Sequence, residues 1–225
     1  MTSSRRTSVP FDPFHFAREA DAGRHYTTEE AFRTIYRTNH WGAPERSGAG
    51  ASADQAATVL AQLASLVDRL QVRTLLDVPC GDFAWMQHLD ADVQYIGGDV
   101  LPELVALNRQ RYGGPARRFA TIDLMTDDLP DADLLLCRDC LVHLSLDAAR
   151  SALANMRRSR CRWLLTTTFP GCTANEDIVT GDWRPLNLQL APFDLPAPEI
   201  LLNEGCTESD GLFADKSLGL WRLTP

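Results

Sequence analysis

Apolar residues recur at helical spacing in three stretches of the first third of the chain. These stretches are predicted as helices and comprise residues 14–20, 28–38 and 53–70. In the second of them Phe32, Ile35 and Tyr36 share one face. The Gly-, Ser- and Ala-rich residues 43–52 between the second and third helices are predicted to form a loop.

The remaining chain alternates short apolar runs with helical segments. Seven runs are predicted as strands: residues 72–78, 93–97, 116–122, 132–137, 163–168, 199–203 and 217–223. Helical segments are expected at residues 83–89, 102–112 and 146–158. Strands that alternate with helices favour right-handed crossovers and a parallel sheet covered on both faces. The last two strands are joined without a predicted helix, so we expect them to be antiparallel.

These patterns predict a Rossmann-like α/β fold: a doubly wound, mostly parallel, seven-stranded sheet with a C-terminal antiparallel hairpin and an N-terminal helical cap. We expect residues 1–10 to be disordered, residues 11–57 to form the cap and residues 58–225 to form a single globular unit. Residues 170–198 are proline-rich and too long for an ordinary connection, so we expect this insertion to cover a substrate.

The charge balance excludes several classes of partner. The 225 residues include 22 Lys and Arg against 30 Asp and Glu, a formal charge of −8, whereas nucleic-acid binding needs clustered basic residues. No apolar run approaches the roughly 18 residues of a membrane span, and residues 1–10 contain no signal-peptide core. We therefore expect a cytoplasmic protein that binds a small molecule, not nucleic acid or membrane.

The six cysteines are irregularly spaced, so we expect free thiols. Cys137 and Cys140 have the spacing of a redox or zinc pair. The chain holds no second pair of that kind, and we interpret both as buried packing residues with no metal.

Candidate chemistry lies at the predicted strand ends, where open parallel sheets bind ligands. The first strand ends in Asp77 and leads into a tight turn at Gly81. The second ends in Asp99, which follows Asp77 by 99 − 77 = 22 positions. A carboxylate there can accept two hydrogen bonds from ribose hydroxyls.

This arrangement resembles the class I S-adenosylmethionine-dependent methyltransferases, from about residue 58 to the C-terminus. Asp77 matches the acid and Gly81 the central glycine of the family's first motif, while Pro79 and Phe83 replace the flanking glycines. A nicotinamide enzyme is the alternative, but these two residues would hinder the backbone's approach to its pyrophosphate. The chain is also similar to a subset of the family that reads DVPCGD at this motif.

The resemblance implies S-adenosylmethionine as cofactor and S-adenosylhomocysteine as product. Asp99, with Val100 beside it, would bind the ribose, and Asp123 and Leu124 would bind the adenine. Asp77, Gly81 and Asp82 would bind the methionine end. Pro79 and Arg138 are further candidate cofactor-binding residues, and Trp41, which arrives from the N-terminal helices, is expected to close over the cofactor from the opposite side. Two of these positions have structural alternatives: Asp77 is a candidate helix N-cap, and Asp123 a candidate turn residue.

Methyl transfer needs an aligned nucleophile and a group that removes its proton. Asp139 and His143 follow the fourth strand and share a face if residues 140–144 are helical. His143 is the candidate general base, with Asp139 orienting its ring or binding an amine substrate. Equally, His143 has the surroundings of a structural histidine.

Residues 170–198 supply candidate substrate contacts: Asn175, Trp183, Arg184 and Asn187. The alternative for Trp183 and Arg184 is packing and a surface salt bridge. The predicted function is methyl transfer to oxygen or nitrogen of a small polar metabolite, such as a sugar, amino-acid-derived or natural-product acceptor. Two alternatives are open: a non-methylating enzyme that uses the same cofactor, for cyclisation or aminocarboxypropyl transfer, and a cofactor-binding regulatory protein. The sequence makes no prediction about oligomeric state.

Overall fold

The computed structural model describes residues 11–42 and 53–223. The segment expected to be disordered, residues 1–10, and the loop expected at residues 43–52 lie outside these ranges. Within them no helix combines the length and the apolar character that crossing a bilayer requires. The same ranges hold no group of three or more His, Cys, Asp or Glu side chains that could bind a metal ion, and all six cysteines are free and buried.

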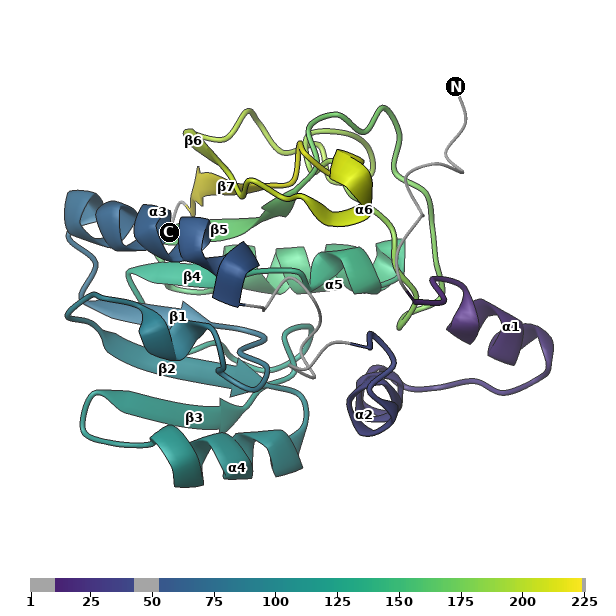
Figure 1. Cartoon of the computed structure of the whole chain (residues 1–225), viewed down its shortest axis with the longest axis horizontal. Helices are drawn as coiled ribbons and strands as arrows, with labels where there is room; N and C mark the ends of the chain where they lie inside the picture. Colours follow the sequence, from purple (N-terminus) through teal and green to yellow (C-terminus); the bar gives the residue numbers. More distant parts are fainter. Residues whose placement is uncertain (1–10, 43–52, 224–225) are drawn as a thin grey trace.

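Seven strands form one sheet in the order β3-β2-β1-β4-β5-β7-β6 (Figure 1). Their bounds are β1 (Thr74–Asp77), β2 (Gln94–Asp99), β3 (Arg117–Thr121), β4 (Leu134–Cys137), β5 (Trp163–Thr168), β6 (Ile200–Asn203) and β7 (Ser217–Arg222). Strands β1 to β5 run parallel, and β7 runs antiparallel to both β5 and β6. The predicted Rossmann-like fold is therefore confirmed.

The long helices have the bounds that their apolar periodicity predicts. They are α2 (Thr28–Thr38), α3 (Ala53–Leu70), α4 (Pro102–Tyr112) and α5 (Leu146–Arg158). Helix α2 begins with a capping box, in which the Thr27 hydroxyl accepts from the Glu30 N–H and the Glu30 carboxylate accepts from the Thr27 N–H. Helix α1 (His15–Asp21) is displaced by one residue from its prediction.

Each face of the sheet has its own apolar core, because successive strand residues point to opposite sides. Leu76 and Leu135 pack with Leu153 of α5 on one face. Leu75 and Leu134 pack with α3 on the other. Strands β4 and β5 are buried along their whole length, as expected for parallel strands covered on both sides.

The N-terminal helices lie beyond the carboxyl ends of the parallel strands (Figure 1). The Asp182 carboxylate anchors α1, since it accepts hydrogen bonds from the N–H groups of Phe16 and Ala17 at 2.7 and 2.9 Å. Phe16 is fully buried against Gly181, where a Cβ atom would lie 2.5 Å from the Phe16 ring. The helical cap is thus attached to the segment that follows β5.

Three short elements differ from their predictions. Residues 83–89 contain only the 3-10 turn η3 (Met86–His88), because Phe83 has a left-handed backbone with φ 62° and cannot continue a helix. Residues 140–144 likewise form the 3-10 turn η4 (Leu141–His143). Strands β6 and β7 are antiparallel as predicted, but the four-residue helical turn α6 (Glu208–Gly211) lies between them.

Candidate active site

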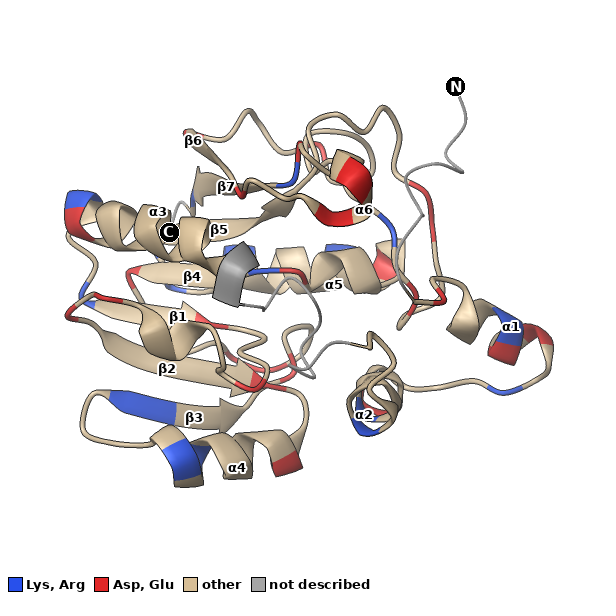
Figure 2. Ribbon diagram, viewed as in Figure 1, with Lys and Arg blue, Asp and Glu red and all other residues tan. Residues whose placement is uncertain are grey.

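The strand order reverses between β1 and β4, which are neighbours in the sheet although β2 and β3 separate them in sequence. Such a reversal opens a crevice at the carboxyl ends of parallel strands. Acidic residues gather at this edge, where β1 and β2 end (Figure 2). Two adjoining cavities lie here, and they share Phe32, Pro79, Asp99 and Cys140.

We name the two cavities by their walls. The aromatic cavity has among its lining residues Ile35, Tyr36, Trp41, Trp85, Arg138 and Asp139. The apolar cavity has among its lining residues Val78, Val100, Ile122, Asp123, Leu124 and Met125. The apolar face of α2 that the sequence predicts is therefore a wall of the aromatic cavity.

Asp99 lies at the junction of the two cavities. Its carboxylate accepts hydrogen bonds from the Gly81 N–H at 3.2 Å and the Leu101 N–H at 3.0 Å. Burial raises the pKa of Asp99 to about 6, although these backbone donors oppose the shift. A carboxylate offers about four acceptor positions, so Asp99 can still accept from two hydroxyl groups of a ligand.

The loop after β1 fits closely under this junction. Gly81 has φ 53°, a conformation that favours glycine, and this directs its N–H to Asp99. Phe83 keeps a left-handed backbone without being glycine, and its buried ring packs on Tyr95 and Phe119 with centroids 4.9 and 5.2 Å away. Pro79 lines both cavities. Positions 81 and 83 thus both have a left-handed backbone, although only position 81 is a glycine.

Asp77 is buried beneath this loop. It accepts a hydrogen bond of 2.6 Å from the Tyr95 hydroxyl, and burial raises its pKa to about 7. Among the described residues, it does not line either cavity. The alternative of a helix N-cap is also not realised, because no helix begins directly after β1. A direct contact between Asp77 and the cofactor stays a prediction.

Asp123 combines both of its predicted interpretations. It lines the apolar cavity beside Leu124, and its carboxylate accepts a hydrogen bond of 2.8 Å from the Met125 N–H, as a turn residue does. Val100 lines the same cavity. The Asp82 carboxylate accepts from the Ala84 N–H at 3.1 Å, and it is not among the cavity-lining residues of the described chain.

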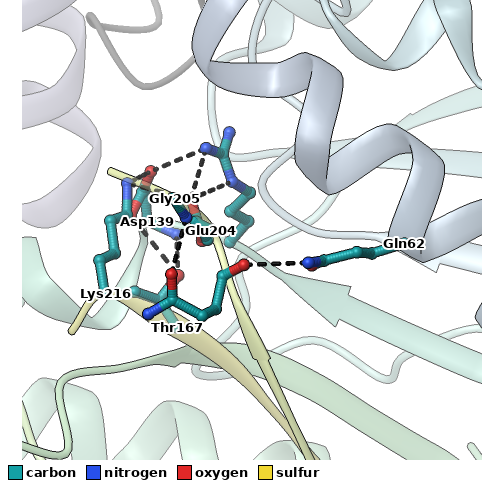
Figure 3. A network of polar contacts seen from close by, with 8 residues as sticks. Gln62, Asp139, Thr167, Glu204, Gly205 and Lys216 are labelled. Atoms are coloured by element: carbon teal, nitrogen blue, oxygen red, sulfur yellow. Dashed lines mark hydrogen bonds and ion pairs between the residues drawn. The ribbon is translucent and has the colours of Figure 1, made fainter. Parts of the chain in front are cut away.

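Figure 3 shows a network of polar contacts that includes Asp139, Glu204 and Lys216. The network borders the aromatic cavity through Asp139 and Arg138, which line it. Lys216 donates to Asp139 at 2.6 Å and lies 3.4 Å from Glu204, which also accepts from Arg138 at 2.7 Å. Burial opposes ionisation of Asp139, but Lys216 and Arg138 outweigh it and lower its pKa to about 2. The Arg138 guanidinium also lies 4.8 Å from the centroid of the Trp85 ring.

His143 is buried beside the N-terminal helices, and in the described part of the chain it lines neither cavity. Its Nδ1 lies 3.0 Å from the carbonyl oxygen of Asp182, so Nδ1 carries the hydrogen and Nε2 is left as the acceptor. The ring lies 4.7 Å from that of Trp41, and burial lowers its pKa to about 4. The ring is thus oriented by Asp182 and not, as predicted, by Asp139, whose carboxylate pairs with Lys216.

Arg184 is almost fully buried and donates only to main-chain carbonyl groups. Its acceptors are the carbonyl oxygens of Leu141, Leu144 and Glu176, at 2.8, 2.6 and 3.1 Å. Burial lowers its pKa to about 9. Arg184 therefore does not form the surface salt bridge considered above. Its guanidinium instead joins residues 170–198 to η4.

The other candidate substrate contacts also serve this segment. The Asn175 amide donates to the carbonyl groups of Asn187 and Ala191, and that of Asn187 donates to Pro170 and Cys172. Trp183 packs edge-on against Phe169 and Phe213. Among the described residues, none of residues 170–198 lines either cavity. Their role in covering a substrate stays a prediction. The contacts described above show that these side chains hold the segment together.

Sequence reasoning missed several residues of the site. Lys216 and Glu204 come from the C-terminal hairpin, and no local pattern marks a buried ion pair of this kind. Trp85 lies in a segment predicted as a helix. Aromatic residues next to a strand end are the signal that could have indicated a cavity wall.

Comparisons with known proteins identify relatives in fold only. No family model matches the chain, and no curated protein matches its sequence. Human N-acetylserotonin methyltransferase, solved with S-adenosylmethionine, superposes with a TM-score of 0.61 and 16% identity, covering 94% of this chain and 66% of that one. This chain therefore spans about two thirds of that protein's length.

Two further structures are similar. The N-methyltransferase NodS from Bradyrhizobium japonicum WM9, solved with S-adenosylhomocysteine, has a TM-score of 0.60 and 16% identity, covering 89% of this chain and all of that one. The [4+2]-cyclase SpnF has a TM-score of 0.52 and 20% identity, covering 73% and 70%. At these identities the likenesses show a common fold.

Proposed function

We propose that the chain is an S-adenosylmethionine-dependent methyltransferase that methylates oxygen or nitrogen of a small polar metabolite. The observation that carries this proposal is the position of Asp99. A single buried carboxylate lies where an apolar cavity and an aromatic cavity adjoin, at the switch point of the sheet. This arrangement suits a nucleoside that carries a reactive group, because the base can lie in the apolar cavity, the ribose at Asp99 and the reactive group in the aromatic cavity.

The residues present fit the cofactor along this groove. Asp99 would accept from the ribose hydroxyls, while Val100, Asp123 and Leu124 would enclose the adenine in the apolar cavity. Pro79, Gly81, Trp41 and Arg138 line the aromatic cavity, where the methionine end would lie. When bound, the cofactor supplies an electrophilic methyl group on a sulfonium. The chain has to bind it, exclude water and align the acceptor.

Asp139 and His143 are the proposed catalytic residues. Asp139 lines the aromatic cavity and is held ionised by Lys216. For an acceptor that must lose its proton during transfer, His143 is the proposed general base, because its Nε2 is an unprotonated acceptor at neutral pH.

The variant His143→Asn tests this base with little structural change. The Asn amide can still donate to the Asp182 carbonyl, but it cannot take up a proton. For an acceptor that must lose its proton during transfer, we expect transfer to fall by about 100-fold, the usual contribution of a general base, with the affinity for S-adenosylhomocysteine unchanged. Unchanged turnover would remove His143 from the mechanism.

A screen of metabolite extracts tests the proposed activity. The purified chain is incubated with the extract and S-adenosylmethionine carrying a deuterated methyl group, and mass spectrometry follows the label. We expect one small metabolite to gain the labelled methyl as S-adenosylhomocysteine accumulates. The Asp99→Asn variant serves as the control, because it should lose the labelled product.

The likeness in fold to the [4+2]-cyclase SpnF supports a second candidate, a cyclase built on this fold, in which S-adenosylmethionine would be bound without transfer of its methyl group. A regulatory protein that binds the cofactor without turnover is the third. The same screen separates them. A metabolite that changes without gaining label indicates the non-methylating enzyme, and binding without any changed metabolite indicates the regulatory protein.

A further inference from the structure

The aromatic cavity contains side chains that the cofactor assignment leaves without a role. Tyr36, Trp85 and Asp139 line this cavity but not the apolar one, and they have no part in enclosing the nucleoside. They bring aromatic rings and one carboxylate into a single space. The acceptor has to occupy this part of the groove, because the reactive end of the cofactor would lie beside it.

Two members of the charged network, Arg138 and Asp139, line the cavity, and Asp139 is the more exposed of them. Its side chain is 28% exposed, against 9% for Lys216 and 3% for Glu204. Its Oδ2 atom accepts from Lys216, whereas within residues 11–42 and 53–223 Oδ1 has a long contact of 3.5 Å with the Thr167 hydroxyl and no shorter one. Oδ1 can therefore accept a short hydrogen bond from a ligand.

The two cations of the network, Arg138 and Lys216, are paired with carboxylates of the network. Arg138 donates twice to Glu204, at 3.2 and 2.7 Å, and its guanidinium lies over the Trp85 ring. Lys216 is buried between Asp139 and Glu204. A ligand in the cavity therefore meets the Asp139 carboxylate and the aromatic side chains of Tyr36 and Trp85, while the charge of Arg138, which also lines the cavity, is balanced by Glu204. A carboxylate beside aromatic side chains is a combination that binds ammonium groups.

We propose that the acceptor is a primary or secondary amine, which binds as an ammonium ion to Asp139 between the aromatic side chains of Tyr36 and Trp85. This inference rests on the proposed function and names the substrate class of the same site. It selects nitrogen over oxygen as the methylated atom.

The chemistry of the site favours such an acceptor. The bound ammonium first loses a proton to water, and the nitrogen lone pair then forms a bond to the methyl carbon. The S–C bond breaks with its electron pair remaining on sulfur, and the Asp139 carboxylate stabilises the positive charge that develops on nitrogen. An alcohol acceptor would depend on His143 as its general base, because Asp139, whose pKa is lowered to about 2, cannot remove its proton, whereas a neutral amine needs no base in the transfer step.

Matched pairs of amines and alcohols test the inference through binding. The probes are phenethylamine with 2-phenylethanol, benzylamine with benzyl alcohol, and cyclohexylamine with cyclohexanol, each titrated into the full chain saturated with S-adenosylhomocysteine. We expect at least one amine to bind about tenfold or more tightly than its alcohol, because a charge-assisted hydrogen bond replaces a neutral one.

The variant Asp139→Asn should abolish this preference while leaving the affinity for S-adenosylhomocysteine within about twofold. Asparagine tolerates the left-handed backbone of this position, where φ is 52°. Asp147→Asn on α5 is the matched control, since its side chain is 96% exposed and it lines neither cavity. It should retain the full preference.

Two results separate the failure of the inference from that of the proposed function. If S-adenosylhomocysteine binds but no amine is preferred to its alcohol, or the preference survives in Asp139→Asn, the inference is overturned and the methyltransferase proposal stands. If S-adenosylhomocysteine does not bind to the wild-type chain, the proposed function is overturned and the inference falls with it.

Discussion

The strand ends and residues 170–198 are both rich in polar side chains, yet they use them in opposite ways. Asp99 and Asp139 line cavities at the strand ends. Arg184, Asn175 and Asn187 instead donate to main-chain carbonyl groups of their own surroundings. The same residue types therefore form a candidate binding site in one region and a scaffold in the other.

The difference follows from how the backbone N–H and C=O groups of each region find hydrogen-bond partners. Strands in a sheet pair their N–H and C=O groups with neighbouring strands, so side chains at their ends are available for ligands. Residues 170–198 lack regular structure, although many of them are buried, and a buried carbonyl group needs a partner. Their side chains supply it. Polar residues in a long buried connection are thus weaker evidence for a substrate site than those at strand ends.

The largest effect that tests this contrast is expected for Arg184→Met. The substitution removes three hydrogen bonds to buried carbonyl groups, and we expect unfolding to become easier by about 4 kcal/mol. Chemical denaturation measures this. Arg150→Met on α5 is the control, because its side chain is 59% exposed and the substitution should cost well under 1 kcal/mol. Equal stability of both variants would contradict the scaffold role.

Asp77 provides a pH-dependent test of a strand-end acid that does not face a cavity. Burial raises its pKa to about 7 in the folded protein, above its ordinary value of 3.8. The folded state therefore keeps a proton that the unfolded chain releases, and stability falls as pH rises from about 4 to about 7. At about 1.4 kcal/mol per pKa unit, this loss amounts to roughly 4 kcal/mol.

The Asp77→Asn variant should lack this part of the pH dependence while still accepting the hydrogen bond from Tyr95. Denaturation at pH 5 and pH 8 compares the two proteins. The wild type should lose more stability between these values than the variant. Parallel curves would show that Asp77 is ionised in the folded protein, as a residue in contact with a solvated ligand site would be.

A smaller effect is expected for Asp99→Asn, measured as affinity for S-adenosylhomocysteine. Asparagine can keep one acceptor for the backbone but loses the charge that would strengthen hydrogen bonds from the ribose. We expect binding to weaken by about 10- to 100-fold, or about 1.4–2.8 kcal/mol. Asp90→Asn, at an exposed position, should bind as the wild type does. An unaffected Asp99→Asn would show that the ribose lies elsewhere.

The sheet and the long helices could be predicted because their signals are local. The periodicity of Phe32, Ile35 and Tyr36 identified one face of α2, and the bounds of four helices agree with the structure. The strand ends likewise identified Asp99 and Asp123 as cavity-lining residues. Parallel strands place their ends at one edge, so position in sequence is enough to group such residues.

The remaining features depend on contacts between distant segments. Periodicity does not show what the apolar face of α2 packs against. In the structure this face forms a wall of the aromatic cavity. The pairing of Asp139 with Lys216 joins the end of β4 to the residue before β7. The Asp182 carbonyl orients His143, a role that the sequence assigned to Asp139. Such partners carry no local pattern, so they were predicted incorrectly or not at all.

Titration calorimetry of the wild-type chain with S-adenosylhomocysteine, with NAD titrated in parallel, decides whether the groove at Asp99 binds this cofactor. We expect saturable binding of S-adenosylhomocysteine at one site per chain and no binding of NAD. Binding of NAD without binding of S-adenosylhomocysteine would contradict this expectation, because the groove at Asp99 would then serve a different nucleotide.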